Sequence, residues 1–221
     1  AAEQQAGAMI AVIDYDTGNL RSVANALGRL GAEFTVTGDA ETIRSADRVL
    51  LPGVGEASSA MEKLRQRGLV EVIRSLTRPV LRICIGVQVM CRRSAEGDTP
   101  CMGIFDTDVK RLGETFPGRP ACSCGCMGPA AAPAEELKVP EMGWNTVERL
   151  RSPLFTGLEE GAYVYYVHSY APGLCPQTIA TTLYGVPFSA ALGRDNFYGT
   201  QFHPEKSGWI GERILKNFLE L

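Results

Sequence analysis

The chain has 221 residues, and its content of 45% hydrophobic and 21% charged residues is close to the average of globular proteins, which excludes a disordered or fibrous protein. Its formal net charge of -3 offers no general basic surface to a phosphate backbone, so nucleic acid is not an expected partner. No apolar run approaches the about 18 residues that cross a bilayer, so we expect no membrane span.

The first eight residues, AAEQQAGA, lack both the cationic start and the apolar core of a signal peptide, and patterned sequence begins only at Met9. We therefore interpret residues 1–8 as a leader or an expression remnant and expect one domain over residues 9–221. Seven cysteines, an odd number without an export signal, fit reduced thiols better than a disulfide framework, so we expect a cytoplasmic protein.

The first half of the domain alternates short apolar strands with amphipathic helices. The patterns predict strands at 9–14, 34–37, 48–51 and 80–84, and helices at 20–30, 57–66 and 87–93. Such alternation is typical of an open, mostly parallel α/β sheet with flanking helices, which binds ligands beyond the carboxyl ends of its strands.

The second half changes character. Short alternating segments between Gly and Pro, at 106–112, 146–150, 163–168, 179–183 and 188–192, indicate a mixed or antiparallel extension of the sheet. The stretch at 117–136 is rich in Pro, Cys and small residues and resembles no regular element, so we predict a surface loop. The chain ends in YGTQF, then His-Pro-Glu, and an amphipathic helix.

Cys84 ends an apolar strand and begins a helical segment, with Gly86 close behind it. This order is typical of a nucleophile on a sharp strand-to-helix turn, where the helix N-terminus favours the thiolate that attacks a carbonyl. A buried structural cysteine is the other interpretation, and the cysteine alone favours it because free cysteines are among the most buried residues.

The segment FHPE adds an imidazole, His203, and a carboxylate, Glu205, two residues apart. In a strand these side chains would share one face, so the carboxylate can orient the ring and stabilise its cation while the ring transfers protons. The chain has two histidines, and we interpret the other, His168, as a satisfied strand residue.

Cys84 with Gly86, followed far downstream by His203-Pro204-Glu205, resembles the Cys-His-Glu triad of the class I glutamine amidotransferases. The motifs IDYDTGNLRSV, LPGVGE, ICIGVQ, VPEMGWN, VHSY, PFSAAL and TQFHPEKS, which span residues 13–207, are similar to those of the glutaminase subunits of imidazole glycerol phosphate synthase. This resemblance covers nearly the whole domain except residues 117–136, and it implies a flavodoxin-like fold.

The resemblance also implies a function. Glutamine is hydrolysed through a thioester on Cys84, and the ammonia passes to a TIM-barrel cyclase partner that makes imidazole glycerol phosphate and AICAR in histidine biosynthesis. No cofactor and no metal are implied. The residues that match the motifs fall into three groups: Gly53 and Val54 for the oxyanion; Gly55, Gly86, Gln88, Ser169 and Tyr170 for the substrate; and Met142, Trp144 and Asn145 for the partner interface.

Arg82 departs from this resemblance, because the family usually has glycine two residues before the nucleophile. Strand alternation places Arg82 on the same face as Cys84, where an unpaired guanidinium costs several kcal/mol. We therefore expect Arg82 to find a carboxylate or reach water, and we expect impaired or untested turnover.

The closely spaced Cys122, Cys124 and Cys126, with Cys91 and Cys101 as possible further ligands, raise the question of a metal site. Their spacing does not match the usual zinc pairs, which are separated by about two to four residues, so we expect incidental loop cysteines.

Two alternative functions remain open at this stage. One is a catalytically impaired, partner-binding subunit of the same fold, if Arg82 disables the pocket. The other is a class I glutaminase of another pathway, for which the triad alone would serve, although the IDYDTGNLRSV and MGWN segments argue against it.

Overall fold

The computed structural model describes residues 8–16, 19–114 and 137–221. Its centre is a seven-stranded sheet in the order β11-β12-β13-β4-β3-β1-β2. These strands are β1 (Ile10–Ile13), β2 (Phe34–Thr37), β3 (Arg48–Leu51), β4 (Val80–Ile83), β11 (Thr178–Tyr184), β12 (Val186–Arg194) and β13 (Phe197–Thr200). Five neighbouring strands, β2, β1, β3, β4 and β13, run parallel to one another. Strands β12 and β11 extend the sheet beyond β13 in antiparallel fashion.

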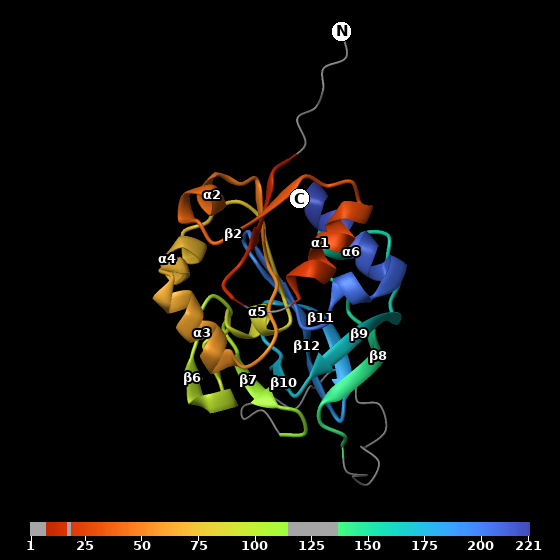
Figure 1. Ribbon diagram of the computed structural model, residues 1–221. Coiled ribbons are helices and arrows are strands. Elements are labelled where there is room, and N and C mark those ends of the chain that lie inside the picture. The colour runs from red at the N-terminus through yellow and green to blue at the C-terminus, as the bar shows by residue number, and fades with distance from the viewer. Residues whose placement is uncertain (1–7, 17–18, 115–136) are drawn as a thin grey trace.

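Helices cover both faces of this sheet. Figure 1 shows α2 (Ala40–Ser45), α3 (Ala57–Gln66) and α4 (Leu69–Arg74) on one side, and α1 (Leu20–Arg29) and α6 (Gly208–Glu220) on the other. Neighbouring residues of β1 face the two sides in turn, so Ala11 and Ile13 pack in one apolar cluster and Ile10 and Val12 in the other. The four-residue helix α5 (Ile85–Gln88) follows β4 at the end of the sheet.

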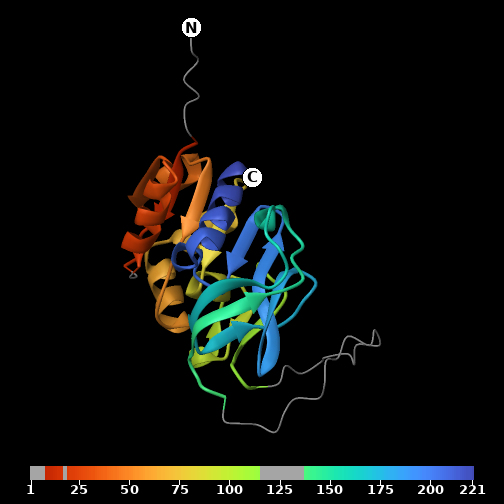
Figure 2. The ribbon, with the colours of Figure 1, turned by 90° about the vertical axis from the view of Figure 1, so that its right-hand side faces the viewer.

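Two smaller sheets lie beside the main one. One combines β5 (Arg93–Ser94), β6 (Thr99–Pro100), β7 (Asp108–Arg111) and β10 (Tyr170–Pro172); the other is the hairpin of β8 (Glu141–Val147) and β9 (Ala162–His168). The hairpin crosses β11 and β12 (Figure 2), where Tyr166 packs edge-on against Phe188. Three short 3-10 helices are η1 (Glu96–Asp98), η2 (Pro153–Phe155) and η3 (Pro204–Lys206). In the described ranges, no helix is both long and apolar enough to cross a membrane.

The predicted fold class is confirmed, and most predicted elements lie within a residue or two of the observed ones. The helix predicted at 87–93 is wrong in length, since α5 ends at Gln88. The Arg92 N–H donates to the Thr107 carbonyl at 2.9 Å, and Arg93 pairs with Pro100 and Asp108, so tertiary strand pairing overrides the helical pattern here. The strand predicted at 146–150 is shifted toward the N-terminus, because the full length of β8 pairs with β9. Helices α2 and α4 were not predicted.

Residues 1–7 and the predicted loop at 117–136, with Cys122, Cys124 and Cys126, lie outside the described residues.

Candidate active site

The parallel strands β3, β4 and β13 end at the same edge of the sheet, and the chain segments that follow them converge there. Cys84 stands at the end of β4 with φ 55° and ψ -113°, and its N–H donates to the Thr200 carbonyl at 2.8 Å. A side-chain-bearing residue rarely adopts such a conformation, which costs about 1–3 kcal/mol and persists only where the surroundings impose it. A Cβ on Gly86 would meet the Leu51 carbonyl oxygen at 2.7 Å, so glycine lets α5 approach β3 closely. The sharp turn predicted at Cys84 is therefore present.

His203 and Glu205 meet behind this turn. The buried ring of His203 makes a 2.7 Å hydrogen bond from Nδ1 to Glu205 Oε1, and the Asn19 side-chain amide donates to the same oxygen at 2.6 Å. The pairing arises differently from the strand alternation expected from the sequence. β13 ends at Thr200, and Glu205 belongs to η3, whose turn brings its carboxylate back to the ring.

The electrostatics of His203 favour the imidazolium. Burial lowers the pKa of this ring, but the neighbouring Cys84 and Glu205 side chains outweigh burial and raise the pKa to about 9. His203 therefore carries its proton near neutral pH. Its Nε2 atom has no hydrogen-bond partner among the described residues, whereas the Cys84 sulfur lies 3.9 Å from the Val167 carbonyl oxygen and 3.8 Å from the Gln201 amide nitrogen.

The segment after β3 is shaped by close packing. A Cβ on Gly53 would lie 2.3 Å from the Tyr15 hydroxyl and 2.5 Å from Ile85 Cγ2, so only glycine fits there. Gly55 has a φ of 97°, a conformation that glycine adopts freely. Val54, between them, is 38% exposed and faces the same pocket as Cys84.

A pocket of about 340 Å³ joins these parts. Its lining residues are Val54, Gly55, Cys84, Ile85, Gln88, Glu96, Pro140, Val167, His168, Ser169, Tyr170 and His203. The pocket thus contains five of the residues predicted to act on or bind substrate around Cys84 and His203: Val54, Gly55, Gln88, Ser169 and Tyr170.

Gln88 lines this pocket and carries an acceptor atom that no described residue uses. Its amide nitrogen donates to the Tyr170 carbonyl at 2.8 Å and to Gln201 Oε1 at 2.9 Å, which occupies both of its hydrogens. Its Oε1 atom is buried and has no hydrogen-bond partner among the described residues. A buried acceptor without a partner is costly, so Oε1 is suited to accept a hydrogen bond from a ligand.

Glu96 was missed by the sequence analysis. It lies in η1, lines the pocket, and accepts a 2.8 Å hydrogen bond from the Ala57 N–H, while burial raises the pKa of its carboxyl. Within the described part of the chain it is the one acidic residue in the pocket lining, and together with Gln88 Oε1 it offers acceptors to an ammonium group. No spacing signal marks Glu96, because only the turn after β5 carries it to the pocket.

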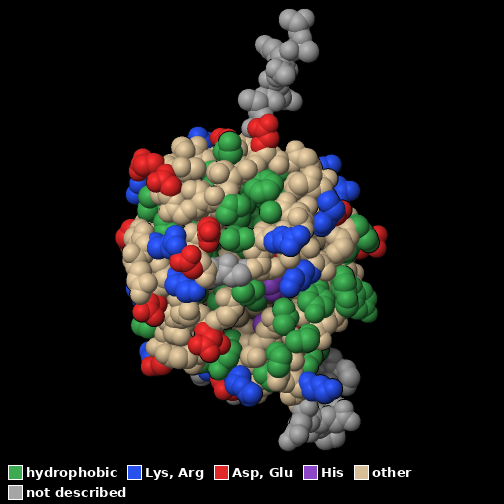
Figure 3. Space-filling model, in the orientation of Figure 1, with side chains coloured by type: hydrophobic (Ala, Val, Ile, Leu, Met, Phe, Trp, Pro, Cys, Tyr) green, Lys and Arg blue, Asp and Glu red, His purple; other side chains and the backbone are tan. Residues whose placement is uncertain are grey.

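The residues predicted for a partner interface lie on the β8–β9 hairpin. Met142 and Trp144 are 66% and 55% exposed, and Tyr163 and Leu183 are also strongly exposed. Figure 3 shows hydrophobic side chains gathered over this part of the surface, next to the visible histidine. Asn145 instead turns inward, since its side-chain amide donates to Glu141 Oε1 at 2.8 Å and to the Leu183 carbonyl at 3.2 Å.

The expectation that Arg82 finds a carboxylate or reaches water is wrong for the described residues. The side chain is fully buried in β4 and contacts no carboxylate among them. Its two terminal nitrogens make only long contacts of 3.4 Å, to the Gly86 carbonyl oxygen and to Met102 Sδ, and its Nε has no hydrogen-bond partner among the described residues. Burial lowers the pKa of Arg82 to about 9, against the opposing effect of Tyr15. The turn at Cys84 nevertheless forms above it.

The thiols of Cys91, Cys101 and Cys175 are free, and burial raises the pKa of each. Among the residues that the structure describes, no group of three or more His, Cys, Asp or Glu side chains is arranged to hold a metal ion.

Comparisons with known proteins identify the family of the chain. Residues 11–221 match the family model "Glutamine amidotransferase class-I". Proteins named imidazole glycerol phosphate synthase subunit HisH are similar along nearly the whole chain. The one from Bacteroides fragilis (strain ATCC 25285) is 52% identical over 96% of this chain and 99% of its own length, and the one from Escherichia coli (strain K12) is 42% identical over the same shares.

Two solved structures from Thermotoga maritima share the fold. A glutamine amidotransferase superposes with a TM-score of 0.58 at 16% identity, covering 97% of this chain and 83% of that one. The structure of PurLQS gives a TM-score of 0.67 at 15% identity, covering 97% and 98%.

Proposed function

Because this chain belongs to the class I glutamine amidotransferase family, we propose that it is the glutamine-hydrolysing subunit of an imidazole glycerol phosphate synthase. The observation that carries the proposal is the strained Cys84 at the head of α5, which shares one pocket with the protonated, Glu205-bound His203. The high identity to relatives named as subunits of that synthase supports the pathway, histidine biosynthesis.

The proposed reaction is amide hydrolysis in two steps. The proton of the Cys84 thiol is held by His203, so the Cys84 thiolate attacks the carboxamide carbon of glutamine, and backbone N–H groups of Gly53 and Val54 stabilise the oxyanion. His203 donates its proton to the departing ammonia, which leaves a glutamyl thioester. His203, now neutral, removes a proton from water, and the hydroxide so generated attacks the thioester. Collapse of this adduct releases the new carboxyl group, which ionises to give glutamate, and restores the Cys84 thiolate beside protonated His203.

Substrate binding follows from the polar groups in the pocket. The α-ammonium of glutamine is held by Gln88 Oε1, which otherwise lacks a partner among the described residues, and by the Glu96 carboxylate. Ser169 and Tyr170 line the same pocket as Cys84, and their backbone meets the amino-acid end of the substrate. Gly55 lines the pocket without a side chain of its own, and Gly86 lets α5 pack against β3 behind Cys84.

The ammonia is used by a partner. The relatives are named as subunits of a synthase, and the resemblance implies a TIM-barrel cyclase as the second subunit. The exposed Met142 and Trp144 on the β8–β9 hairpin, next to the pocket residue Pro140, provide the apolar surface for it.

The test is glutamate release from glutamine by the pure protein, with and without the cognate cyclase plus its nucleotide ligand, beside a Cys84→Ala control. We expect little release alone, a large increase with the cyclase, and none from the control. Strong release without any partner would contradict the role as a synthase subunit. Complex formation without release would instead favour a catalytically impaired, partner-binding subunit.

A further inference from the structure

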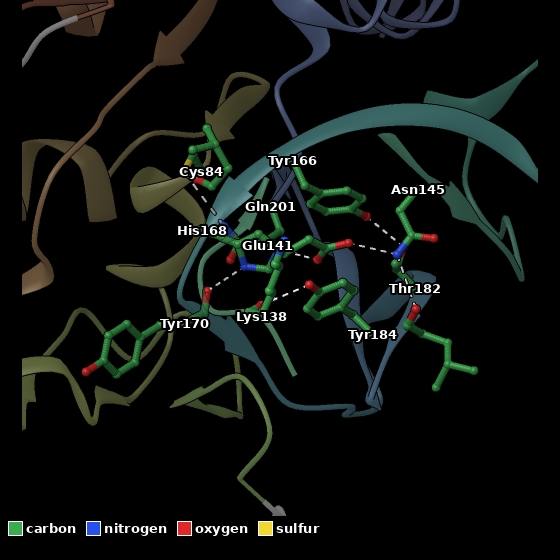
Figure 4. A network of polar contacts seen from close by, with 12 residues as sticks. Cys84, Lys138, Glu141, Asn145, Tyr166, His168, Tyr170, Thr182, Tyr184 and Gln201 are labelled. Carbon is green, nitrogen blue, oxygen red and sulfur yellow. Dashed lines mark hydrogen bonds and ion pairs between the residues drawn. The ribbon is translucent and has the colours of Figure 1, made fainter. Parts of the chain in front are cut away.

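Glu141 and His168 form a buried pair that the proposed reaction does not use. They face each other across β8 and β9, with His168 Nε2 2.8 Å from Glu141 Oε2 and side chains only 2% and 5% exposed. The other carboxylate oxygen accepts from the Asn145 amide, and the other ring nitrogen, Nδ1, lies 2.8 Å from the Tyr170 carbonyl oxygen. Figure 4 shows this chain of contacts leading from Asn145 toward Cys84.

The proton positions in this pair follow from its partners. A carbonyl oxygen only accepts, so His168 Nδ1 must carry a hydrogen and donate it to Tyr170. The short contact between Nε2 and Glu141 Oε2 then requires one further proton between them, either on the ring or on the carboxyl. Both arrangements are neutral overall and leave the Nδ1–H donor aimed at Tyr170.

The Tyr170 carbonyl also accepts from the Gln88 amide, so both of its lone pairs are used. Because the Gln88 NH2 group is bound by Tyr170 and Gln201, the Gln88 oxygen is left as the atom free to accept from a ligand. The pair thus lies one carbonyl away from the acceptor that the substrate meets, and Gln201 continues the contacts to the Cys84 sulfur.

We propose that Glu141 and His168 are positioning residues for glutamine binding: the pair anchors the Tyr170 carbonyl, and this carbonyl fixes the Gln88 amide so that its oxygen faces the substrate. The inference rests on the proposed function, because it takes glutamine to be the occupant of the pocket. Neither residue transfers a proton to the reacting atoms, so their loss weakens binding of the ground state more than it slows chemistry.

Two substitutions of Glu141 separate positioning from bulk packing. Glu141→Leu fills a similar volume but leaves His168 Nε2 and the Asn145 amide without the carboxyl group that each contacts. Glu141→Gln keeps both contacts, because its amide nitrogen donates to a neutral His168 and its oxygen accepts from Asn145. Tyr166→Phe is the matched control, since it removes a buried 2.6 Å hydrogen bond from β9 of the same hairpin to Thr182 of β11 without touching Tyr170 or Gln88.

The measurement is calorimetric binding of glutamine to the complex with the cyclase, in a Cys84→Ala background that prevents turnover. We expect Glu141→Leu to raise the dissociation constant about 10-fold, the effect of one buried hydrogen-bonding group losing its partner, and Glu141→Gln and Tyr166→Phe to stay within about 3-fold. With Cys84 present, Glu141→Leu should raise KM by a similar factor and leave kcat and the rate of Cys84 alkylation nearly unchanged, which also shows that the pocket is folded.

Three outcomes would contradict the positioning role of Glu141 and His168. Unchanged glutamine affinity in Glu141→Leu overturns the inference, and so does equal loss in Glu141→Leu and Glu141→Gln, which indicates a purely structural pair. If the Cys84→Ala complex with wild-type Glu141 does not bind glutamine at all, the proposed function fails first, and the inference fails with it.

Discussion

Two buried polar regions adjoin Cys84, and they are built in opposite ways. On the hairpin side, His168, Glu141 and Asn145 use every side-chain nitrogen and oxygen that the burial cuts off from water. Beneath the turn, Arg82 is as deeply buried but has two long contacts and one nitrogen without a partner among the described residues. In the first region, hydrogen bonds fix the orientation of every side chain. In the second, the fold buries a charged side chain with few hydrogen bonds, which costs stability.

This difference in hydrogen bonding indicates which of the two buried regions influences the geometry of the pocket. A satisfied network specifies one arrangement of its members, and here it leads to the acceptor that faces the pocket. Arg82 determines little of the arrangement around it, because its two contacts, to the Gly86 carbonyl of α5 and to Met102, are long. Its unfavourable burial is then a matter of stability, and the backbone turn that holds Cys84 forms in spite of it.

The largest effect is expected from breaking the satisfied region. His168→Leu removes the ring and leaves the Glu141 carboxylate buried without its strongest partner, which we expect to lower the free energy of unfolding by about 3–5 kcal/mol. Urea denaturation followed by circular dichroism measures the change. A loss below about 1 kcal/mol would mean that water reaches Glu141 and that the two regions differ less than their contacts indicate.

The opposite sign is expected beneath the turn. Arg82→Met replaces the guanidinium by an apolar side chain of similar length, beside Met102 and the buried strand neighbours, and should raise the free energy of unfolding by about 1–4 kcal/mol. The same denaturation experiment tests it, with Arg44→Met on the surface as a control that should change little. Destabilisation by Arg82→Met would show that Arg82 is held more favourably than its distances suggest.

A smaller effect follows from pH. Arg82 has a folded pKa of about 9, below its usual value near 12.5, so between these values the unfolded chain binds more protons than the folded one. Stability from this group therefore rises as the pH increases above about 9. The advantage of Arg82→Met over the wild type should shrink by roughly 1–2 kcal/mol between pH 8.5 and 10.5. A constant difference across that range would contradict the lowered pKa.

The sequence predicted correctly those elements whose structure follows from a local residue pattern, such as an apolar run. The apolar runs of β1, β3 and β4 and the position of Cys84 at the end of β4 follow from such signals. Glu96 carries no signal, since its place in the pocket depends on the pairing of β5 with β6 and β7, which also shortened the predicted helix. The fate of Arg82 was misjudged because alternation predicts the face of a side chain but not which neighbours fill the space around it.

The predicted roles of the site residues stay predictions, but the structure shows where each of these residues lies. Cys84, His203 and Glu205 are brought together by η3 rather than by strand alternation, and Asn19, from the start of α1, joins them without any hint from its motif. Asn145 belongs to the network on the inner side of the hairpin, whereas Met142 and Trp144 remain on its outer side.

The exposure of the hairpin also determines which process the tryptophan fluorescence of this protein reports. The chain has two tryptophans, Trp144 and Trp209, and they are 55% and 69% exposed. Both indoles are already largely hydrated in the folded state, so their emission should be red-shifted and should change little on unfolding. Docking of a second subunit over β8 and β9 would bury Trp144 and shift its emission to the blue, so the intrinsic fluorescence of this protein would report assembly rather than unfolding of the core.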